Sequence, residues 1–226
     1  MEITQVAPRL HLLDYSIGQA YLWRDEEELT LIDAGWAGSA DATTEAIRAA
    51  GLDPDRLQRI VLTHCHGDHV GGAQELADRH GAEILAHRLD APVIRGEAPV
   101  PEPDLLDWEL PLYEHGLTVP AAPPTRVDRE VEDGEELGFG DGAVVVHTPG
   151  HTPGSLAVHL PSHGVLFTGD TVASVQGVMF GVFHVDRDQA MESMRRLAKL
   201  APSVLCCGHG APVTEGTAAR FAAAAG

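Results

Sequence analysis

The feature that most limits how this chain can fold is a cluster of charged and metal-ligating side chains that directly follows an apolar run. His64, His66, Asp68 and His69 fall within six residues, after Ile60-Val61-Leu62. An apolar core would desolvate these groups at a high free-energy cost, and a solvated surface gives no reason to gather them. The pattern therefore indicates a metal site.

Three further candidate ligands, His151, Asp170 and His209, lie just past predicted strands or in glycine-bounded turns. Glycine beside a ligand permits unusual backbone angles and close approach to a metal. With the four clustered residues they make seven ligands, which are too many for one tetrahedral zinc ion. Seven suit two metals that share one carboxylate. Two divalent cations would also balance the two aspartates and a bridging hydroxide, which would otherwise repel one another.

The residues His64-Cys65-His66-Gly67-Asp68-His69, followed by His151, Asp170 and His209, resemble the HxHxDH…H…D…H signature of the metallo-β-lactamase superfamily. The Leu31-Ile32-Asp33-Ala34-Gly35 stretch is similar to the first motif of that family, and the resemblance runs from Leu29 to His209. It implies an α/β (α+β) fold, a four-layer αββα sandwich of two packed mixed β-sheets with outer helices. It further implies that one metal is bound by His64, His66 and His151, that the other is bound by Asp68, His69 and His209, and that Asp170 bridges them.

Asp33 has two interpretations. At the end of a predicted strand it is either a turn former or a carboxylate that supports a ligand from behind. Asp68 is expected to act in catalysis by orienting the nucleophile as well as by binding metal. The sequence names no residues that bind substrate.

Period-two and period-3.6 patterns organise the rest of the chain as one domain, residues 1–226. We expect helices from Ser39 or Asp41 to Ala50, after the histidine cluster to His80, over residues 187–200 and near the C-terminus. Expected strands cover residues 3–13, 20–23, 29–32, 59–63, 83–86, 127–131, 135–139, 143–146, 156–160, 165–168 and 204–206. The 127–131 and 135–139 strands flank Asp133-Gly134, a hairpin signal.

Residues 88–126 differ from the rest, because seven of the 15 prolines lie between Ala98 and Pro124. We expect a mostly irregular insertion there. It is either a functional lid or binding loop or a surface excursion without a role.

The composition limits the kinds of binding partner that this protein can have. There are 34 acidic residues against 15 basic ones, a formal net charge of −19, which disfavours nucleic acid and anionic membrane surfaces. No run of 18 apolar residues and no signal peptide is evident, and three cysteines do not form a disulfide framework. These features predict a cytoplasmic protein with a small-molecule substrate. If residues 172–183 are exposed, their apolar side chains favour a homodimer.

The resemblance and the ligand count together predict a hydrolase that uses a metal-bridging hydroxide to cleave a small ester, thioester or lactone, with a glyoxalase II-like or lactonase-like site. We expect two divalent ions, with zinc favoured over iron or manganese. The alternative is an oxidoreductase that resembles the mononuclear-iron persulfide dioxygenases, with iron held by His64, His151 and Asp170. A metal-bound binding module without turnover is a third interpretation.

Overall fold

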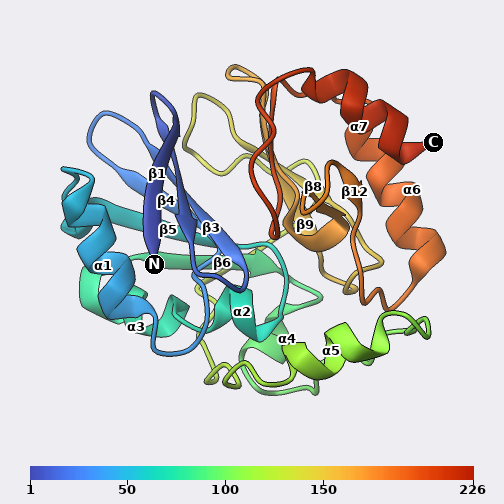
Figure 1. The fold of residues 1–226 in the computed structure, drawn as a ribbon. Coiled ribbons are helices and arrows are strands. Elements are labelled where there is room, and N and C mark those ends of the chain that lie inside the picture. Colours follow the sequence, from blue (N-terminus) through green and yellow to red (C-terminus); the bar gives the residue numbers. More distant parts are fainter. The chain divides into compact units, whose positions relative to one another are not determined.

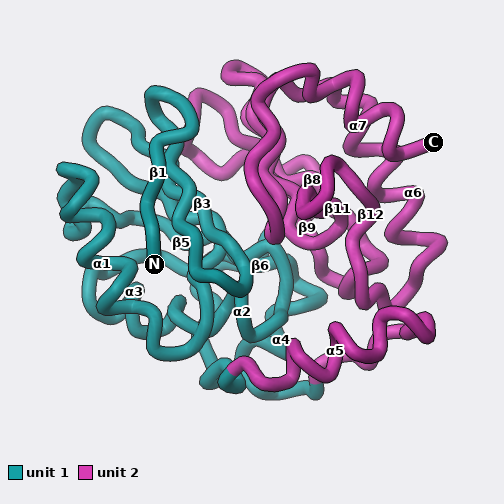
Figure 2. Tube along the Cα trace, in the orientation of Figure 1, with its two compact units in different colours: residues 1–99, 120–131 teal, residues 100–119, 132–226 magenta.

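The computed structural model describes residues 1–226 (Figure 1). Packing divides the chain into two compact units, coloured separately in Figure 2. Unit 1 comprises Met1–Pro99 and Pro120–Val131, and unit 2 comprises Val100–Val119 and Glu132–Gly226. The central part of the proline-rich insertion therefore packs with unit 2, whereas its two flanks pack with unit 1.

Unit 1 is built on a seven-stranded mixed sheet in which the strands follow one another in sequence order, β1 to β7. The first four are antiparallel neighbours, and β4, β5, β6 and β7 pair in parallel. The strands expected over residues 20–23 and 29–32 are confirmed, whereas the single strand expected over residues 3–13 is a hairpin of two. The strands are β1 (Glu2–Ala7), β2 (Leu10–Asp14), β3 (Gln19–Arg24), β4 (Leu29–Ile32), β5 (Leu57–Leu62), β6 (Glu83–His87) and β7 (Arg129–Val131).

The helices of unit 1 are short and amphipathic, and the apolar residues of α1 and α3 join the core of the sheet. Helix α3 ends at Gly81, whose left-handed backbone closes the helix. The single helix expected after the histidine cluster is two helices, because Gly71 and Gly72 interrupt it. A side chain at either glycine would strike the backbone of residues 34–37. The helices are α1 (Ala40–Ala49), η1 (Pro54–Arg56), α2 (Gly67–Val70), α3 (Ala73–His80) and α4 (Ala91–Ile94).

Unit 2 contains a four-stranded mixed sheet in the order β13-β10-β9-β8 and a small β11-β12 ladder. Met194 and Leu197 of α6 and Phe221 of α7 share a buried cluster with Leu166 and Leu205 of the sheet. The strands are β8 (Val144–His147), β9 (Leu156–Leu160), β10 (Val165–Phe167), β11 (Val172–Ala173), β12 (Met179–Phe180) and β13 (Val204–Cys206). The helices are α5 (Leu110–Gly116), η2 (Gly169–Thr171), α6 (Arg187–Ala198) and α7 (Thr217–Ala225).

The hairpin expected across Asp133-Gly134 is wrong. Residues 129–131 form β7, which pairs in parallel with β6. Residues 135–139 form no strand, and Leu137 instead donates a backbone hydrogen bond to Ala143. The turn preference of Asp133-Gly134 does not decide the pairing, because residues 129–131 pair with the edge of β6 instead.

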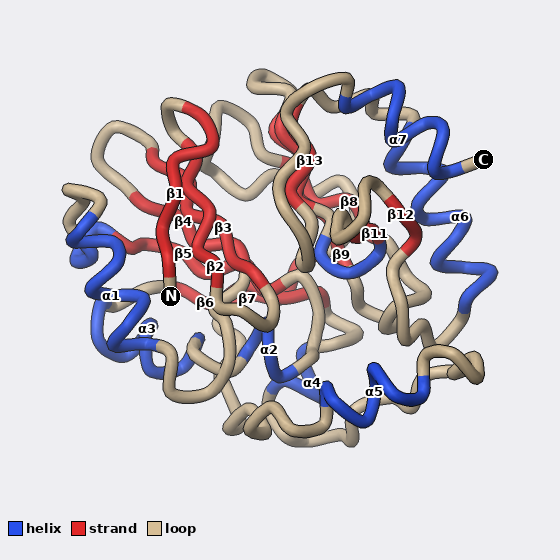
Figure 3. The backbone as a smooth tube through the Cα atoms, viewed as in Figure 1, coloured by secondary structure: helices blue, strands red, loops and turns tan.

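The insertion is mostly irregular, as expected, and its regular parts are the short helices α4 and α5. Two mixed sheets, each with helices of its own, confirm the α/β class predicted from the sequence (Figure 3). No helix in the chain combines the length and the apolar character needed to cross a lipid bilayer.

Candidate metal centre

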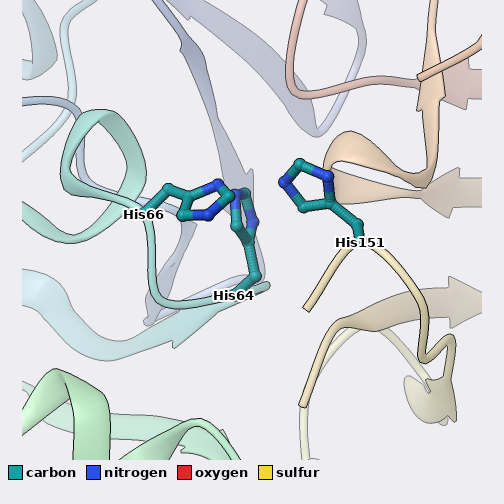
Figure 4. A group of neighbouring side chains, drawn as sticks. All are labelled: His64, His66 and His151. Carbon is teal, nitrogen blue, oxygen red and sulfur yellow. The ribbon is translucent and has the colours of Figure 1, made fainter. Parts of the chain in front are cut away.

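The four clustered residues lie in the loop after β5 and in the short helix α2 of unit 1. The ring centroids of His64 and His66 are 4.7 Å apart, and those of His64 and His69 are 4.2 Å apart. Figure 4 shows the rings of His64 and His66 beside each other, and also draws His151 of unit 2. His69 Nε2 lies 3.5 Å from Asp68 Oδ2. Two atoms bound tetrahedrally at about 2.1 Å to one metal would be about 3.4 Å apart, so this pair has the spacing of shared ligands.

Asp33 lies behind this cluster, at the end of β4, and is 2% exposed. Its Oδ1 accepts a hydrogen bond from the Thr63 backbone N–H (2.8 Å). Its Oδ2 accepts from the Thr63 hydroxyl (2.8 Å) and from His69 Nδ1 (2.9 Å). Asp33 also has a positive φ of 60°, a conformation that non-glycine residues keep only when the surroundings hold it.

The network around Asp33 defines which ring nitrogens of His64 and His69 donate a hydrogen bond. A carboxylate only accepts, so His69 Nδ1 must be the donor. The Thr63 hydroxyl gives its one proton to Asp33, so His64 Nδ1, at 3.0 Å from Thr63 Oγ1, donates to that oxygen. A neutral imidazole that donates through Nδ1 carries its lone pair on Nε2. Both rings are therefore in the form that binds a metal through Nε2.

Close backbone packing sets the positions of these residues. Gly18, in the turn between β2 and β3, has a φ of +72°, and a Cβ there would lie 2.9 Å from the Asp68 carbonyl oxygen. The backbone N–H of Ala34 donates to the His69 carbonyl at 2.7 Å. The turn containing Gly18 and the loop after β4 thus both contact α2, the short helix that carries Asp68 and His69.

Unit 2 brings His151, Asp170 and His209 together. Asp170 belongs to η2 after β10, and His209 lies in the turn after β13. Asp170 Oδ2 is 3.1 Å from His209 Nε2 and 3.7 Å from His151 Nε2. At these spacings the Asp170 carboxylate and the two imidazoles can act as neighbouring metal ligands.

The loop that precedes α6 orients His151. His151 Nδ1 donates to the Val182 carbonyl oxygen at 3.1 Å, so its lone pair also lies on Nε2. Gly181 allows this loop to lie against Asp170, since a Cβ at this position would be 1.9 Å from the Asp170 carbonyl oxygen.

His184, beside this loop, is completely buried. Its ring centroid lies 5.5 Å from that of His151 and 4.2 Å from that of Phe180. Burial lowers the pKa of His184 to about 4, so the ring is neutral at physiological pH.

Cys65 lies between two of the candidate ligands but is 5% exposed and packs in the core of unit 1. Burial, with the nearby Asp90 carboxylate, raises the pKa of its thiol. The protonated thiol behaves as a small apolar side chain.

Sequence reasoning missed two contributors to these arrangements. Thr63 connects Asp33 to His64, and only its place directly before the cluster could have drawn attention to it. The Val182 carbonyl supports His151 through the backbone, which leaves no signal in the sequence.

Both units therefore present imidazole nitrogens and carboxylate oxygens of the kind that bind divalent transition metals. The chain matches the family model of the metallo-beta-lactamase superfamily over residues 13–209. It belongs to that superfamily of metal-dependent hydrolases.

Two curated relatives show how far the similarity extends. The probable metallo-hydrolase YflN of Bacillus subtilis (strain 168) is 30% identical, with 93% of this chain and 87% of that protein covered. A hydroxyacylglutathione hydrolase of Cereibacter sphaeroides is 31% identical over 74% of this chain, but only 52% of that protein is covered.

Solved structures agree on the fold. A metallo-beta-lactamase family protein of Thermus thermophilus superimposes with a TM-score of 0.70 at 25% identity, with 97% of this chain and 80% of that chain covered. The αββα fold class expected from the sequence is confirmed.

Proposed function

We propose that this protein is a dinuclear metal-dependent hydrolase that cleaves a small ester, thioester or lactone. In this proposal His64, His66 and His151 hold one divalent cation, and Asp68, His69 and His209 hold the other. Asp170 contributes an oxygen to both. The donor set suits zinc first, and iron or manganese can also occupy such sites.

One observation carries the proposal. Three imidazoles from two parts of the chain, His64, His69 and His151, each donate through Nδ1 to an oxygen acceptor. Metal-ligating histidines are oriented in this way, with the other ring nitrogen directed to the metal. Histidines buried for packing alone would not need one common tautomer.

The two cations, when bound, would lower the pKa of a coordinated water and polarise the carbonyl oxygen of the substrate. The protein's part is to hold these groups in place. Asp68 Oδ2 lies 3.5 Å from His69 Nε2. We assign Asp68 the additional role of orienting the nucleophile. Asp33 fixes His69 from behind, and the loop around Val182 fixes His151.

Two relatives support the substrate class. Hydroxyacylglutathione hydrolase and, in Gallus gallus, acyl-coenzyme A thioesterase MBLAC2 both carry names of thioester-cleaving enzymes. An attack on an activated acyl carbon is common to esters, thioesters and lactones, so these three groups are the first substrates to test. Localisation in the cytoplasm remains part of the same proposal.

The test uses the purified full chain, freed of metal with a chelator and then loaded with zinc, iron or manganese. Hydrolysis of a p-nitrophenyl ester, an acyl thioester and an acyl lactone is measured with each loaded form. We expect at least one substrate to be cleaved, with activity lost on chelation and restored by metal.

Asp170→Asn is expected to lower this activity by at least 100-fold. His163→Ala is the matched control, since His163 pairs with exposed Asp141 and precedes β10, whereas Asp170 follows the other end of that strand. The proposal fails if no metal form cleaves any of the three substrates, or if Asp170→Asn is as active as the control.

A further inference from the structure

The loop between β12 and α6 is bonded on one side to the segment that carries His151. The Val182 carbonyl accepts from His151 Nδ1 at 3.1 Å. In addition, the backbone N–H of Val185 donates to the His151 carbonyl (3.2 Å), and that of Asp186 donates to the Gly150 carbonyl (2.9 Å). The position of this loop therefore determines how the His151 ring is held.

The other end of the same peptide group is bonded to the insertion. The peptide that supplies the Val182 carbonyl also supplies the Phe183 N–H, which donates to Glu109 Oε1 at 3.3 Å. A carboxylate, a peptide group and an imidazole thus form a continuous hydrogen-bonded chain from Glu109 to His151.

Glu109 has the environment of a residue held for a specific purpose. Its side chain is completely buried, although it lies in an otherwise exposed segment. Its Oε2 accepts from the Leu106 backbone N–H (2.9 Å) and forms an ion pair with Arg187 Nη2 (2.6 Å). These donors outweigh the effect of burial and hold the pKa of Glu109 below its usual value. The carboxylate is therefore charged at physiological pH.

The peptide that Glu109 contacts is strained. Phe183 has a φ of +59°, a left-handed backbone conformation that is unfavourable for a residue with a side chain. Its ring centroid lies 5.4 Å from that of Tyr113, on α5. The Asp104 backbone N–H also donates to the His184 carbonyl at 2.8 Å. Contacts from residues 104–113 thus hold the loop in a conformation that it would not adopt alone.

We propose that Glu109 is a positioning residue for His151, which it holds and polarises through the Val182–Phe183 peptide. A charged acceptor on the Phe183 N–H draws electron density toward the Val182 oxygen, which becomes a stronger acceptor for His151 Nδ1. That hydrogen bond fixes the tautomer and raises the basicity of Nε2. The insertion is then part of the active-site machinery. The inference rests on the proposed role of His151 as a metal ligand.

The test compares Glu109→Ala, Glu109→Gln and wild type as full-length, metal-free protein. Zinc affinities are measured by competition with a chromogenic chelator. The protonation of each His151 nitrogen is measured by NMR of protein labelled with ¹⁵N-histidine, with His151→Gln used to assign the signals. Circular dichroism and thermal unfolding verify that each variant is folded.

We expect Glu109→Ala to weaken one zinc-binding step by about 10–100-fold and to shift the His151 Nδ1 signal away from that of a protonated nitrogen. Glu109→Gln keeps an acceptor for the Phe183 N–H and should restore most of both. If Glu109→Ala does not fold, Glu109→Gln alone decides, with an expected loss of a few-fold and a smaller shift of the same signal.

Asp128→Asn is the matched control. Asp128, in unit 1, also accepts from a backbone N–H, that of Ile84, and pairs with an arginine, Arg126. It should change neither zinc affinity nor the His151 signal. The inference is overturned if wild type binds zinc but the Glu109 variants match it in affinity and in NMR signal. If wild type itself binds no metal, the proposed function is what fails.

Discussion

Asp33→Asn is the substitution that isolates the electrostatic role of a single buried carboxylate. Asparagine has nearly the same shape and tolerates a positive φ well, so the backbone at 60° does not have to change. The amide retains one acceptor oxygen for the Thr63 backbone N–H. It places an NH₂ group where the Thr63 hydroxyl and His69 Nδ1 now donate.

The expected magnitude follows from these two contacts. Hydrogen bonds to a charged group each contribute about 1.5–3 kcal/mol. The least costly response is for His69 to move its proton to Nε2, so that Nδ1 can accept from the amide. That tautomer has no lone pair on Nε2 for a metal. A loss of about 10–100-fold in metal affinity, equivalent to about 1.4–2.7 kcal/mol, is expected.

The assay is chelator competition with zinc on the metal-free proteins, together with thermal unfolding with and without zinc. Asp14→Asn is the control, because Asp14 is exposed and accepts only a local bond from the Ser16 N–H. The reasoning is refuted if Asp33→Asn binds zinc within threefold of the control, since the carboxylate would then contribute nothing through His69.

Gly181→Ala should abolish metal binding and destabilise unit 2 by about 1–3 kcal/mol in denaturant unfolding. The reason is that the new Cβ would lie 1.9 Å from the Asp170 carbonyl oxygen. A variant with the stability and metal affinity of wild type would show that this contact is not tight. Phe221→Ala should cost about 3–5 kcal/mol in the same experiment, because the ring is fully buried in the unit 2 cluster; a cost below about 1 kcal/mol would mean that α7 is not packed as described. Since the pKa of Glu109 is lowered in the folded protein, its stabilisation is present above the unfolded pKa of about 4.3 and is lost as the pH falls through the lower folded value. The gap in melting temperature between wild type and Glu109→Gln should therefore be widest near pH 7 and shrink below pH 4, and a gap that is constant with pH would contradict the charged pair with Arg187.

Most of the strands and the order of the candidate ligands could be predicted because both are local properties of the sequence. Apolar runs identify β4, β5 and β10, and a ligand-type residue follows within three residues of the end of each strand. The break between α2 and α3 was harder to predict from the local sequence. It depends on the backbone of residues 34–37, which packs against Gly71 and Gly72 from a distant part of the chain.

The sequence offers Asp33 as a candidate supporting carboxylate, but the residues that Asp33 contacts and the role of Glu109 could not be predicted, for the same reason. Asp33 reaches Thr63 and His69 across 30 and 36 residues, and Glu109 reaches Phe183 across 74. No spacing in the sequence encodes such contacts. The irregular composition of the insertion even hid Glu109, since a buried glutamate there follows no periodic pattern.

The most direct test of the proposed dinuclear centre is the metal stoichiometry of the full chain. Metal-free protein is reconstituted with zinc and freed of excess, and bound metal is then measured by elemental analysis alongside Asp170→Asn. The account predicts about two equivalents per wild-type chain and fewer in the variant, with hydrolytic activity following occupancy. A wild-type protein that binds a single iron, takes up oxygen with a persulfide substrate and gains nothing from a second metal would contradict it.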